Sequence, residues 1–323
     1  MSTFNLVFLD AATFGDTSLE RFSTTWTCSV AELTGAKEVS ERLAGQRCAI
    51  VNKFVLDRKI LLSPATQELQ LIAVAATGTN NVDIDCARSR GIAVCNVPSY
   101  ATYSVAQFTI SLVFEMATRA VGHALGVRAG RWQESPIFTR HDYPTFDLHH
   151  KVLGVIGYGS IGRKVAEMAR ALGMEVLVAA RLGDQPGSND PRVSFEDVLS
   201  QADFVTLHCP LTPGTTQLID RHTLALMKPT AFLINTARGG LIDELALIEA
   251  LEKNQLAGAA LDVISQEPPS PDHSIIEAAS RLENLWVTPH CAWATHEARH
   301  RLLGEVFHNI AAFQRGERRN RLD

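Results

Sequence analysis

The sequence predicts an α/β protein of two lobes, each built on a doubly wound parallel sheet. The main observation is that short apolar runs alternate with helix-like segments, once in the first hundred residues and again after residue 152. The runs are almost continuously apolar, as expected when helices cover both faces of a sheet. The length of 323 residues also exceeds the usual size of one domain.

The first series of apolar runs predicts the strands of the first lobe. We predict strands over 5–10, 48–53, 69–78 and 92–97. Helices are predicted over 37–45 and 83–91, and Gly91 closes the second of them. Because strands that alternate with helices are joined by crossovers, these strands are expected to be parallel.

A long helix is predicted next, over 104–130. Apolar residues recur at helical spacing within it: Val105, Phe108, Leu112 and Met116. A helix of this length is expected to link two lobes or to pack against another subunit. Residues 131–150 contain two prolines and little periodicity, which predicts a loop or an arm.

The second series begins at Val152. Six strands are predicted, over 152–157, 175–180, 203–209, 230–236, 258–263 and 285–289. Helical segments separate most of them, including 160–173 and 243–255. The last helix is expected to start near Thr295, whose hydroxyl suits an N-cap.

Composition argues against several classes of partner. The net charge is −5, and the basic tail over 315–323 is short, so we expect a solvated end and no nucleic-acid contact. No apolar run approaches the roughly 20 residues that span a bilayer, and the N-terminus reads as a strand and not as a signal peptide. The six cysteines form no CxxC pair, which favours free thiols in a reducing cytoplasm.

A glycine-rich turn follows the first strand of the second series. Gly157, Gly159 and Gly162 are spaced as GxGxxG, between an apolar strand and a helix that leads to another strand. The first glycine permits a tight turn, the second lets the backbone approach a pyrophosphate, and the third lets the helix pack closely on the strand. The turn predicts a dinucleotide site; the plain alternative is a strand–helix turn without a ligand.

The end of the next strand bears on the choice of dinucleotide. An NAD site usually has an acid there, which binds the ribose 2′-hydroxyl. Ala180 occupies that position and Arg181 follows; an arginine can pair with a 2′-phosphate. The sequence therefore favours NADP over NAD, unless Asp184 folds back to supply the acid.

Three polar residues follow strands of the second series. Arg238, Glu267 and His290 each come shortly after an apolar run, and ligands of open parallel sheets bind beyond the carboxyl ends of the strands. We therefore expect the three side chains to converge near the nicotinamide. Taken singly, each has a plain alternative: Arg238 could be a surface cation, Glu267 a solvated acid and His290 a packed ring.

The chain resembles the D-isomer-specific 2-hydroxyacid dehydrogenases over nearly its whole length. The similar segments are VAATGTNNVDIDCARSRGIAVCNVPSYATYSVAQ, GVIGYGSIGRKVA, DFVTLHCPLTPGTTQLID, LINTARGGLIDELAL, ALDVISQEPP and NLWVTPHCAWATHEAR. Within the family, NVPSYATYSVAQ and PHCAWATHEAR look most like the glycerate dehydrogenase and hydroxypyruvate reductase branch. The resemblance implies an oxidoreductase that transfers a hydride between NAD(P)H and a small 2-keto acid, most readily hydroxypyruvate or glyoxylate.

The resemblance also implies an architecture. It predicts two Rossmann-like lobes with the active site in the cleft between them. Residues 1–99 plus 292–323 would form a flavodoxin-like substrate lobe, and 100–291 the dinucleotide-binding lobe. Family members are usually homodimers joined through the cofactor lobes, so the helix from Ser104 and the arm over 131–150 are the expected contact elements.

The same resemblance implies roles for individual residues. His290 would donate a proton to the developing alkoxide, Glu267 would hold the other ring nitrogen, and Arg238 would bind the substrate carboxylate. Thr77, Gly78 and Thr79 match the loop that holds the substrate carboxylate in the family. Lys53, at the end of an apolar run, is a candidate second cation for that carboxylate, and a surface lysine is the plain alternative. The cofactor-lining positions are Gln107, Gly157, Tyr158, Gly159, Ser160, Ile161, Gly162, Arg181, Cys209, Pro210, Thr215, Thr236, Ala237 and Asp262. Ala180, His150 and Cys291 depart from the family's usual residues.

Other interpretations stay open at this point. A zinc site could draw on His208-Cys209 and His290-Cys291, but adjacent residues at a strand end point to opposite faces, so we expect no metal. C-terminal-binding-protein corepressors share the fold and the Arg/Glu/His set while acting through partners. A dehydrogenase for a larger 2-keto acid is a further alternative; formate and phosphite dehydrogenases share the fold, but their substrates have no carbonyl.

Overall fold

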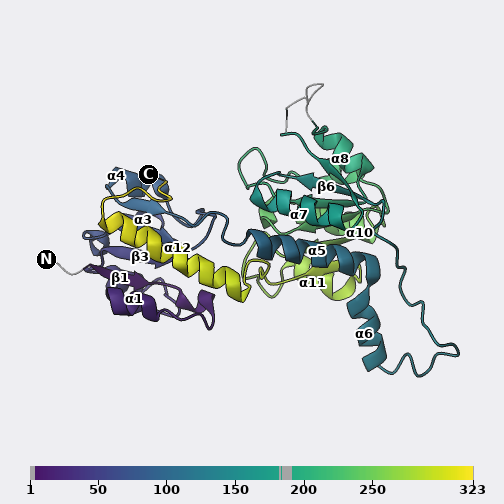
Figure 1. Ribbon diagram of the computed structural model, residues 1–323, viewed down its shortest axis with the longest axis horizontal. Helices are drawn as coiled ribbons and strands as arrows, with labels where there is room; N and C mark the ends of the chain where they lie inside the picture. Colours follow the sequence, from purple (N-terminus) through teal and green to yellow (C-terminus); the bar gives the residue numbers. More distant parts are fainter. Residues whose placement is uncertain (1–3, 182, 184–190, 323) are drawn as a thin grey trace. The chain divides into compact units, whose positions relative to one another are not determined.

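The computed structural model describes residues 4–181, 183 and 191–322, and the chain divides into two compact units (Figure 1). The first unit comprises Met1–Ala101 and Ala294–Asp323, and the second comprises Thr102–Trp293. The predicted divisions, after residues 99 and 291, lie two residues from these. Each unit is an α/β layer structure around one parallel sheet, as the alternation of apolar runs predicts.

The first unit contains a five-stranded parallel sheet in the order β2-β1-β3-β4-β5. Its strands are β1 (Asn5–Phe8), β2 (Thr27–Val30), β3 (Cys48–Val51), β4 (Leu71–Val74) and β5 (Ala93–Cys95). The order reverses between β1 and β3, as in flavodoxin-like sheets. Strand β2 is not among the predicted strands, because it lies at the edge with largely exposed residues and so lacks a continuous apolar run.

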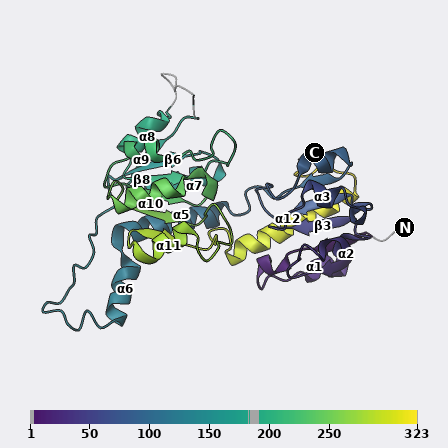
Figure 2. The same ribbon diagram turned by 180° about the vertical axis from the view of Figure 1, so that it is seen from behind.

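Helices of the first unit cover this sheet, and the last helix of the chain packs with them (Figure 2). They are α1 (Glu20–Thr25), α2 (Val39–Leu43), α3 (Arg58–Leu61), α4 (Ile84–Ser89) and α12 (His296–Gln314), with short 3-10 turns over Ala11–Phe14 and Pro64–Thr66. Helix α12 contacts β4. The hydroxyl of Thr295 accepts a hydrogen bond from the Ala298 N–H, so the predicted N-cap is confirmed.

The second unit contains a six-stranded parallel sheet in the order β11-β10-β9-β8-β6-β7. Its strands are β6 (Val152–Ile156), β7 (Glu175–Val178), β8 (Phe204–Leu207), β9 (Phe232–Asn235), β10 (Gly258–Leu261) and β11 (Leu285–Val287). All six strands predicted for this unit are present. The order reverses between β6 and β8, and ligands of open α/β sheets bind beside such a reversal.

Helices cover both faces of the second sheet. They are α5 (Thr102–Thr118), α6 (Ala120–Arg128), α7 (Ser160–Ala171), α8 (Phe195–Gln201), α9 (Arg221–Leu226), α10 (Glu244–Glu252) and α11 (Ser274–Arg281), with a 3-10 turn over Gly239–Leu241. Helix α5 lies against α7, and α10 lies against α9 and α11. None of the helices over the described residues is both long enough and apolar enough to cross a membrane.

The prediction of one helix over 104–130 is wrong, because the chain breaks at Arg119. Arg119 adopts the left-handed conformation, with φ 50° and ψ 33°, between α5 and α6. The buried carboxylate of Glu115 accepts a hydrogen bond from the Val121 N–H at 3.2 Å, which stabilises the start of the new helix. The helical spacing of apolar residues does not reveal that a single residue within it adopts another conformation. Residues 131–150 form the predicted arm without regular structure.

Candidate active site

The glycine-rich turn joins β6 to α7, and packing requires two of its three glycines. Gly157 has φ 94°, and a Cβ there would overlap the backbone of His208 and Cys209. A Cβ on Gly162 would overlap the carbonyl oxygen of Gly157. Around Gly159, by contrast, a Cβ would meet no atom within 4 Å. The turn is therefore tight at its two ends and open in its middle, as a phosphate-binding turn requires.

The N-terminus of α7 fits an anion. Helices α8, α10 and α12 have side-chain N-caps from Ser194, Asp243 and Thr295, whereas α7 has none at Gly159. The first N–H groups of a helix have no partner within the helix, and the helix dipole places positive charge there. The open space at Gly159 and the uncapped α7 suit the pyrophosphate of a dinucleotide. Tyr158 and Ser160 are exposed beside this space, and Ile161 is half-buried.

The residues after β8 lie beside the same turn, because Gly157 packs on them. Cys209 is half-buried, and burial raises the pKa of its thiol. Burial lowers the pKa of His208 to about 4, so this imidazole is neutral near pH 7. The hydroxyl of Thr215 accepts from the Thr212 N–H at 2.8 Å and donates to the carbonyl of Pro210 at 2.7 Å. That hydroxyl therefore stabilises the 210–215 turn itself.

The end of β7 contains no acid. Ala179 pairs with Val193 in an isolated bridge. Ala180 is buried, and its N–H donates to the Val193 carbonyl at 2.8 Å. Arg181 is exposed directly after it. Asp184, the alternative acid, lies outside the described residues.

Arg238, Glu267 and His290 follow three adjacent strands. In the sheet, Leu261 of β10 pairs with Asn235 of β9 and with Val287 of β11. These three positions stand at the same level across the sheet, and each polar residue lies three to six positions beyond one of them. The parallel sheet therefore brings all three residues to one edge.

His290 and Glu267 form the most direct polar contact at this edge. Nδ1 of His290 lies 2.5 Å from Oε2 of Glu267, and the two side chains are 22% and 31% exposed. The carboxylate can only accept, so Nδ1 carries the proton in this hydrogen bond. Oε1 of Glu267 accepts from the Ile264 N–H at 3.1 Å. The pair leaves Nε2 as the ring atom available to a ligand.

The loop that presents His290 is built around Asp262, whose side chain is almost completely buried. Its carboxylate accepts from the Thr288 hydroxyl at 2.7 Å, the Cys291 N–H at 3.0 Å and the Ala292 N–H at 2.9 Å. His290 itself lies in the left-handed region, with φ 50°. Such a conformation persists in a non-glycine residue where its surroundings enforce it. The sequence placed Asp262 among the cofactor-lining residues and gave no sign of this organising role.

Cys291 points toward Asp262. Its Sγ lies 3.6 Å from Oδ1 of Asp262, and burial, followed by the negative charge of Asp262, raises the pKa of the thiol. The two residues of the His290-Cys291 pair therefore contact different carboxylates. In the described parts of the chain, His, Cys, Asp and Glu side chains nowhere gather in a group of three that could hold a metal ion.

Arg238 lies at the N-terminus of the 3-10 turn after β9 and is half-buried. Its Nη1 donates to the Ala237 carbonyl at 2.6 Å, while Asn235 hydrogen-bonds both the Ala237 N–H and the Arg238 carbonyl. A Cβ on Gly239 would overlap the backbone of Ile264. The Arg238 turn therefore lies directly against the loop that carries Glu267.

Of the other predicted cofactor-lining residues, Thr236 connects this edge to α5. The Thr236 hydroxyl lies 3.0 Å from the Thr109 hydroxyl of α5. Gln107 is exposed on the same helix. Helix α5 also packs on α7, so the residues after β9 and the helix of the glycine turn share a neighbour.

In the first unit, the predicted substrate-binding residues stand at the carboxyl edge of its own sheet. Lys53 follows β3, and the carboxylate of Asp10 accepts from the Lys53 N–H at 2.6 Å and the Phe54 N–H at 2.8 Å. Asn81 donates to the Phe54 carbonyl at 3.0 Å. Sequence reasoning missed Asp10 and Asn81. The sequence marks Asp10 only by its position, as an acid at the end of an apolar run.

The loop over Thr77, Gly78 and Thr79 follows β4 at the same edge of that sheet. The hydroxyl of Thr77 donates to the Val97 carbonyl at 2.8 Å, and Asn96 donates to the Thr77 carbonyl at 2.8 Å. Gly78 and Thr79 are half-buried. The loop is thus joined to the residues that follow β5.

Sequence comparison finds relatives along almost the whole chain. The sequence pattern described as "D-isomer specific 2-hydroxyacid dehydrogenase, NAD binding domain" matches residues 110–292. A glycerate dehydrogenase of Methylorubrum extorquens is 40% identical over 326 residues, which cover 98% of this chain and 98% of the relative. A hydroxypyruvate reductase of Blautia hydrogenotrophica is 36% identical over 286 residues, which cover 88% and 87%.

Structural comparison gives the same fold. The crystal structure of the TT0316 protein from Thermus thermophilus matches with a TM-score of 0.84 and 33% identity. The match covers 99% of this chain and 100% of that one. Both parallel sheets therefore belong to an architecture already seen in a solved structure.

Proposed function

The chain belongs to the D-isomer-specific 2-hydroxyacid dehydrogenase family, and we propose that it reduces hydroxypyruvate or glyoxylate to the 2-hydroxy acid. Enzymes of this family act on the CH–OH group of their donors with NAD(P). The substrate proposal draws on the similarity to a glycerate dehydrogenase and a hydroxypyruvate reductase. A preference for a larger 2-keto acid is the competing outcome.

The observation that carries the proposal is the 2.5 Å contact between His290 and Glu267. A carboxylate on Nδ1 stabilises the imidazolium and fixes the ring. His290 then gives its Nε2 proton to the substrate carbonyl oxygen as the C=O π bond breaks. The hydride adds to the carbonyl carbon and forms the new C–H bond, so one hydride and one proton are added to the keto acid. A positioned general acid contributes about 10²–10⁴ in rate.

Arg238 is proposed to bind the substrate carboxylate. Its planar guanidinium pairs with a carboxylate through two parallel hydrogen bonds. The contact of Gly239 with Ile264 fixes the Arg238 turn beside the Glu267 loop. The carboxylate would thus be held next to the residues that deliver the proton. Lys53 and the loop 77–79 are proposed as further substrate contacts in the first unit.

The residues of the second unit fit an NAD(P) molecule. Bound there, the nicotinamide supplies the hydride. The glycine turn 157–162 and the N-terminus of α7 would hold the pyrophosphate, for which Gly159 leaves room. Residues 209–210, 215 and 236–237, with Gln107 and Asp262, are proposed to line the rest of the dinucleotide. Asp262 combines this proposed role with its observed hydrogen bonds to the His290 loop.

We propose a preference for NADPH over NADH. A carboxylate at the end of β7 would repel a 2′-phosphate, and Ala180 stands there instead. The exposed Arg181 can pair with that phosphate. The preference is measured as the KM for each cofactor, with Arg181→Ala expected to raise the KM for NADPH and to leave that for NADH nearly unchanged. A lower KM for NADH in the unaltered enzyme would contradict the proposal.

The decisive experiment is an assay of 2-keto acids with both cofactors, followed at the nicotinamide absorbance. We expect hydroxypyruvate or glyoxylate to have the highest kcat/KM. His290→Ala is expected to lower kcat by about 10²–10⁴ while leaving the Kd for NADPH unchanged. Turnover of none of the keto acids would favour a protein that binds NAD(P) and acts through partners. Equal losses in kcat and cofactor affinity would mean that His290 is structural.

A homodimer formed through the second unit is also proposed. Helix α6 and the arm expose several large apolar side chains: Val121, Leu125, Val127, Trp132, Ile137 and Phe138. Phe138 is 90% exposed. A segment with so many exposed large apolar side chains is typical of an interaction site, and the resemblance to dimeric family members indicates a second copy as its occupant.

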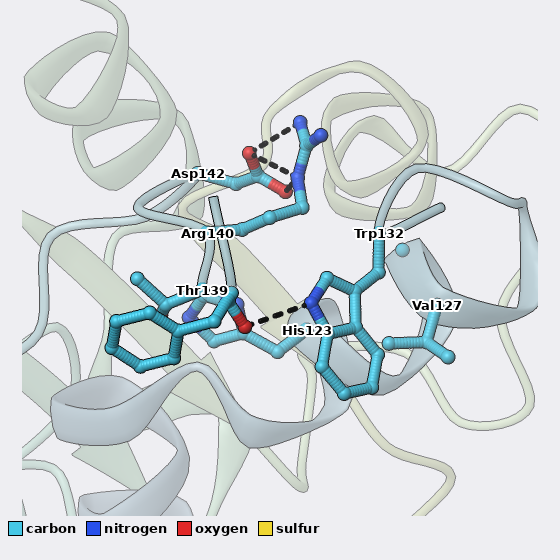
Figure 3. A pocket seen from close by; sticks show the side chains of 8 residues that line it. His123, Val127, Trp132, Thr139, Arg140 and Asp142 are labelled. Atoms are coloured by element: carbon cyan, nitrogen blue, oxygen red, sulfur yellow. Dashed lines mark hydrogen bonds and ion pairs between the residues drawn. The ribbon is translucent and has the colours of Figure 1, made fainter. Parts of the chain in front are cut away.

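The arm and α6 line a small, open pocket on this surface (Figure 3). The cavity measures about 240 Å³. Trp132 donates its indole N–H to the Phe138 carbonyl at 3.1 Å, and Arg140 pairs with the Asp142 carboxylate. His123, Val127 and Thr139 are the other labelled residues that line the pocket. The arm is thereby held to itself, and Val127, Trp132 and Phe138 of the exposed apolar side chains line the pocket.

A further inference from the structure

A cluster of polar side chains lies behind the loop that carries Glu267 and has no role in the chemistry described above. It consists of Glu244, Ser265 and His273. We infer that Glu244 is a positioning residue, which fixes the Glu267 loop so that Glu267 meets His290. The inference rests on the proposed function, because it assigns Glu244 an effect only through Glu267.

Both carboxylate oxygens of Glu244 engage Ser265. Oε1 accepts from the Ser265 N–H at 2.6 Å, and Oε2 accepts from the Ser265 hydroxyl at 2.8 Å. The Glu244 side chain is 10% exposed. Hydrogen bonds to an ionised carboxylate are stronger than those between neutral groups. Ser265 stands two residues before Glu267, so this double contact limits where the Glu267 backbone can lie.

His273 stands behind the carboxylate. Its Nε2 lies 3.7 Å from Oε2 of Glu244 and 3.4 Å from the Ser265 hydroxyl. The His273 side chain is 8% exposed, and its Nδ1 has no hydrogen-bond partner among the residues that the structure describes. The imidazole thus packs against one side of the Glu244 carboxylate, and Ser265 is the hydrogen-bond partner of both carboxylate oxygens.

The loop itself offers few other anchors. Residues 265–269 are all exposed, so no buried side chain of this segment holds it in place. Gly239 packs against the peptide bond that joins Ile264 to Ser265. Glu244 is the first residue of α10 and lies six positions after Arg238. It therefore joins the segment that carries Arg238 to the segment that carries Glu267.

An acid in the first turn of a helix has a simpler explanation, because it interacts favourably with the helix dipole. That explanation requires only negative charge near the N-terminus. It does not account for two oxygens directed at one residue in another loop, and the N-cap of α10 is already supplied by Asp243. The two explanations differ in what happens to catalysis when Glu267 is absent.

The test is a double-mutant cycle on kcat, with Glu244→Ala made in the unaltered enzyme and in Glu267→Ala. We expect Glu244→Ala alone to lower kcat about 10- to 100-fold, the scale of a displacement near 1 Å. The Kd for NADPH is expected to stay unchanged. In the Glu267→Ala background, Glu244→Ala is expected to have no further effect on kcat, because residues that act as a unit are not additive.

Two further variants keep the test informative if Glu244→Ala fails to fold. Glu244→Gln retains an acceptor for the Ser265 N–H, and we expect it to recover most of the lost kcat. Ser265→Ala removes the hydroxyl and keeps the N–H, so an intermediate kcat is expected. The matched control is Glu249→Ala, since Glu249 lies on the same helix and pairs with Arg221 and Lys253 at the surface; its kcat is expected to be unchanged.

Two results would overturn the inference. One is a loss of kcat on Glu244→Ala that is as large in the Glu267→Ala background as in the unaltered enzyme. The other is an unchanged kcat for both Glu244→Ala and Ser265→Ala while Glu267→Ala is impaired. An unchanged kcat in Glu267→Ala itself would instead contradict the proposed function, so the two failures are distinguishable.

Discussion

His290 shows how much of the site depends on the conformation of one residue. Its left-handed backbone, with φ 50°, turns the ring toward Glu267 while Asp262 holds the residues on either side. Left-handed non-glycine residues cost on the order of 1–3 kcal/mol and are found where the surroundings enforce them. The hydrogen bonds of the Asp262 carboxylate supply that enforcement here.

The glycine turn yields a prediction at the same scale. Gly162→Ala should destabilise the second unit by about 1–3 kcal/mol, because its Cβ would overlap the Gly157 carbonyl. Gly159→Ala should leave stability nearly unchanged, since the space around it is open, yet weaken NADPH binding. Thermal unfolding and fluorescence titration of NADPH measure the two effects. Tight binding by Gly159→Ala would show that the pyrophosphate lies elsewhere.

His208 gives a prediction about pH. Its Nε2 is buried and finds no hydrogen-bond partner within residues 4–181, 183 and 191–322. Burial lowers the folded-state pKa to about 4, below the value near 6.5 expected for an unfolded chain. The unfolded state thus binds more protons between pH 6.5 and 4. The folded state should lose on the order of 3 kcal/mol from this group as the pH falls through that range.

The measurement compares the unaltered protein with His208→Gln, which carries no ionisable group there. The difference between their free energies of unfolding should change by that amount between pH 7 and pH 4. The matched control is His222→Gln, at an exposed position on α9, which removes an imidazole without opening a buried site and should not reproduce the loss seen at His208. A constant difference for His208→Gln would mean that water reaches the ring.

At the scale of elements, most strands and helices follow from the local sequence pattern, and two exceptions have a structural reason. The predicted strands of both units are present, because a buried parallel strand needs a continuous apolar run. The missed strand β2 lies at an edge and lacks that run. The predicted long helix is divided at Arg119, where a hydrogen bond from Val121 to Glu115 stabilises the break.

The cap of α12 supplies a prediction for an element. Thr295→Ala should destabilise the first unit by about 1 kcal/mol, because the Ala298 N–H would lose its acceptor. Thr295→Ser keeps the hydroxyl and should remain close to the unaltered protein. Amide hydrogen exchange at Ala298 reports the change locally, and faster exchange is expected in Thr295→Ala alone. Equal exchange rates in the three proteins would show that the cap contributes nothing.

At the scale of the whole molecule, the chain forms two units that each complete their own core. The last helix belongs to the unit formed by the first hundred residues, so the chain leaves the first unit and returns to it. The exposed apolar side chains of α6 and the arm belong to the second unit. The proposed dimer would cover them.

The oligomeric state tests that proposal. Phe138→Asp combined with Leu125→Asp should convert a dimer to a monomer in sedimentation velocity, because two charges would be buried against apolar surface. Leu33→Asp is the matched control, since Leu33 is also an exposed leucine but lies in the first unit. It should leave the dimer intact. A monomer in the unaltered protein at micromolar concentration would contradict the proposal.

The sequence by itself determined the features that depend on local pattern. Alternating apolar runs predicted both parallel sheets, GxGxxG predicted the strand–turn–helix at Gly157, and Thr295 predicted a cap. Polar residues just beyond strands identified Arg238, Glu267 and His290 as candidates, because parallel strands bring their carboxyl ends to one edge. Such features need only residue type and spacing over a few positions.

Only the tertiary structure decided which side chains hold these candidates in place. Asp262 reaches Thr288 and Ala292, Glu244 reaches Ser265, and Asp10 reaches Lys53. Each pair is separated by more than 20 positions, and no periodicity links its members. Their meeting depends on the packing of whole elements, and so does the left-handed turn at His290. The chemistry could therefore be anticipated from residue types, whereas the precision of the site is a property of the folded chain.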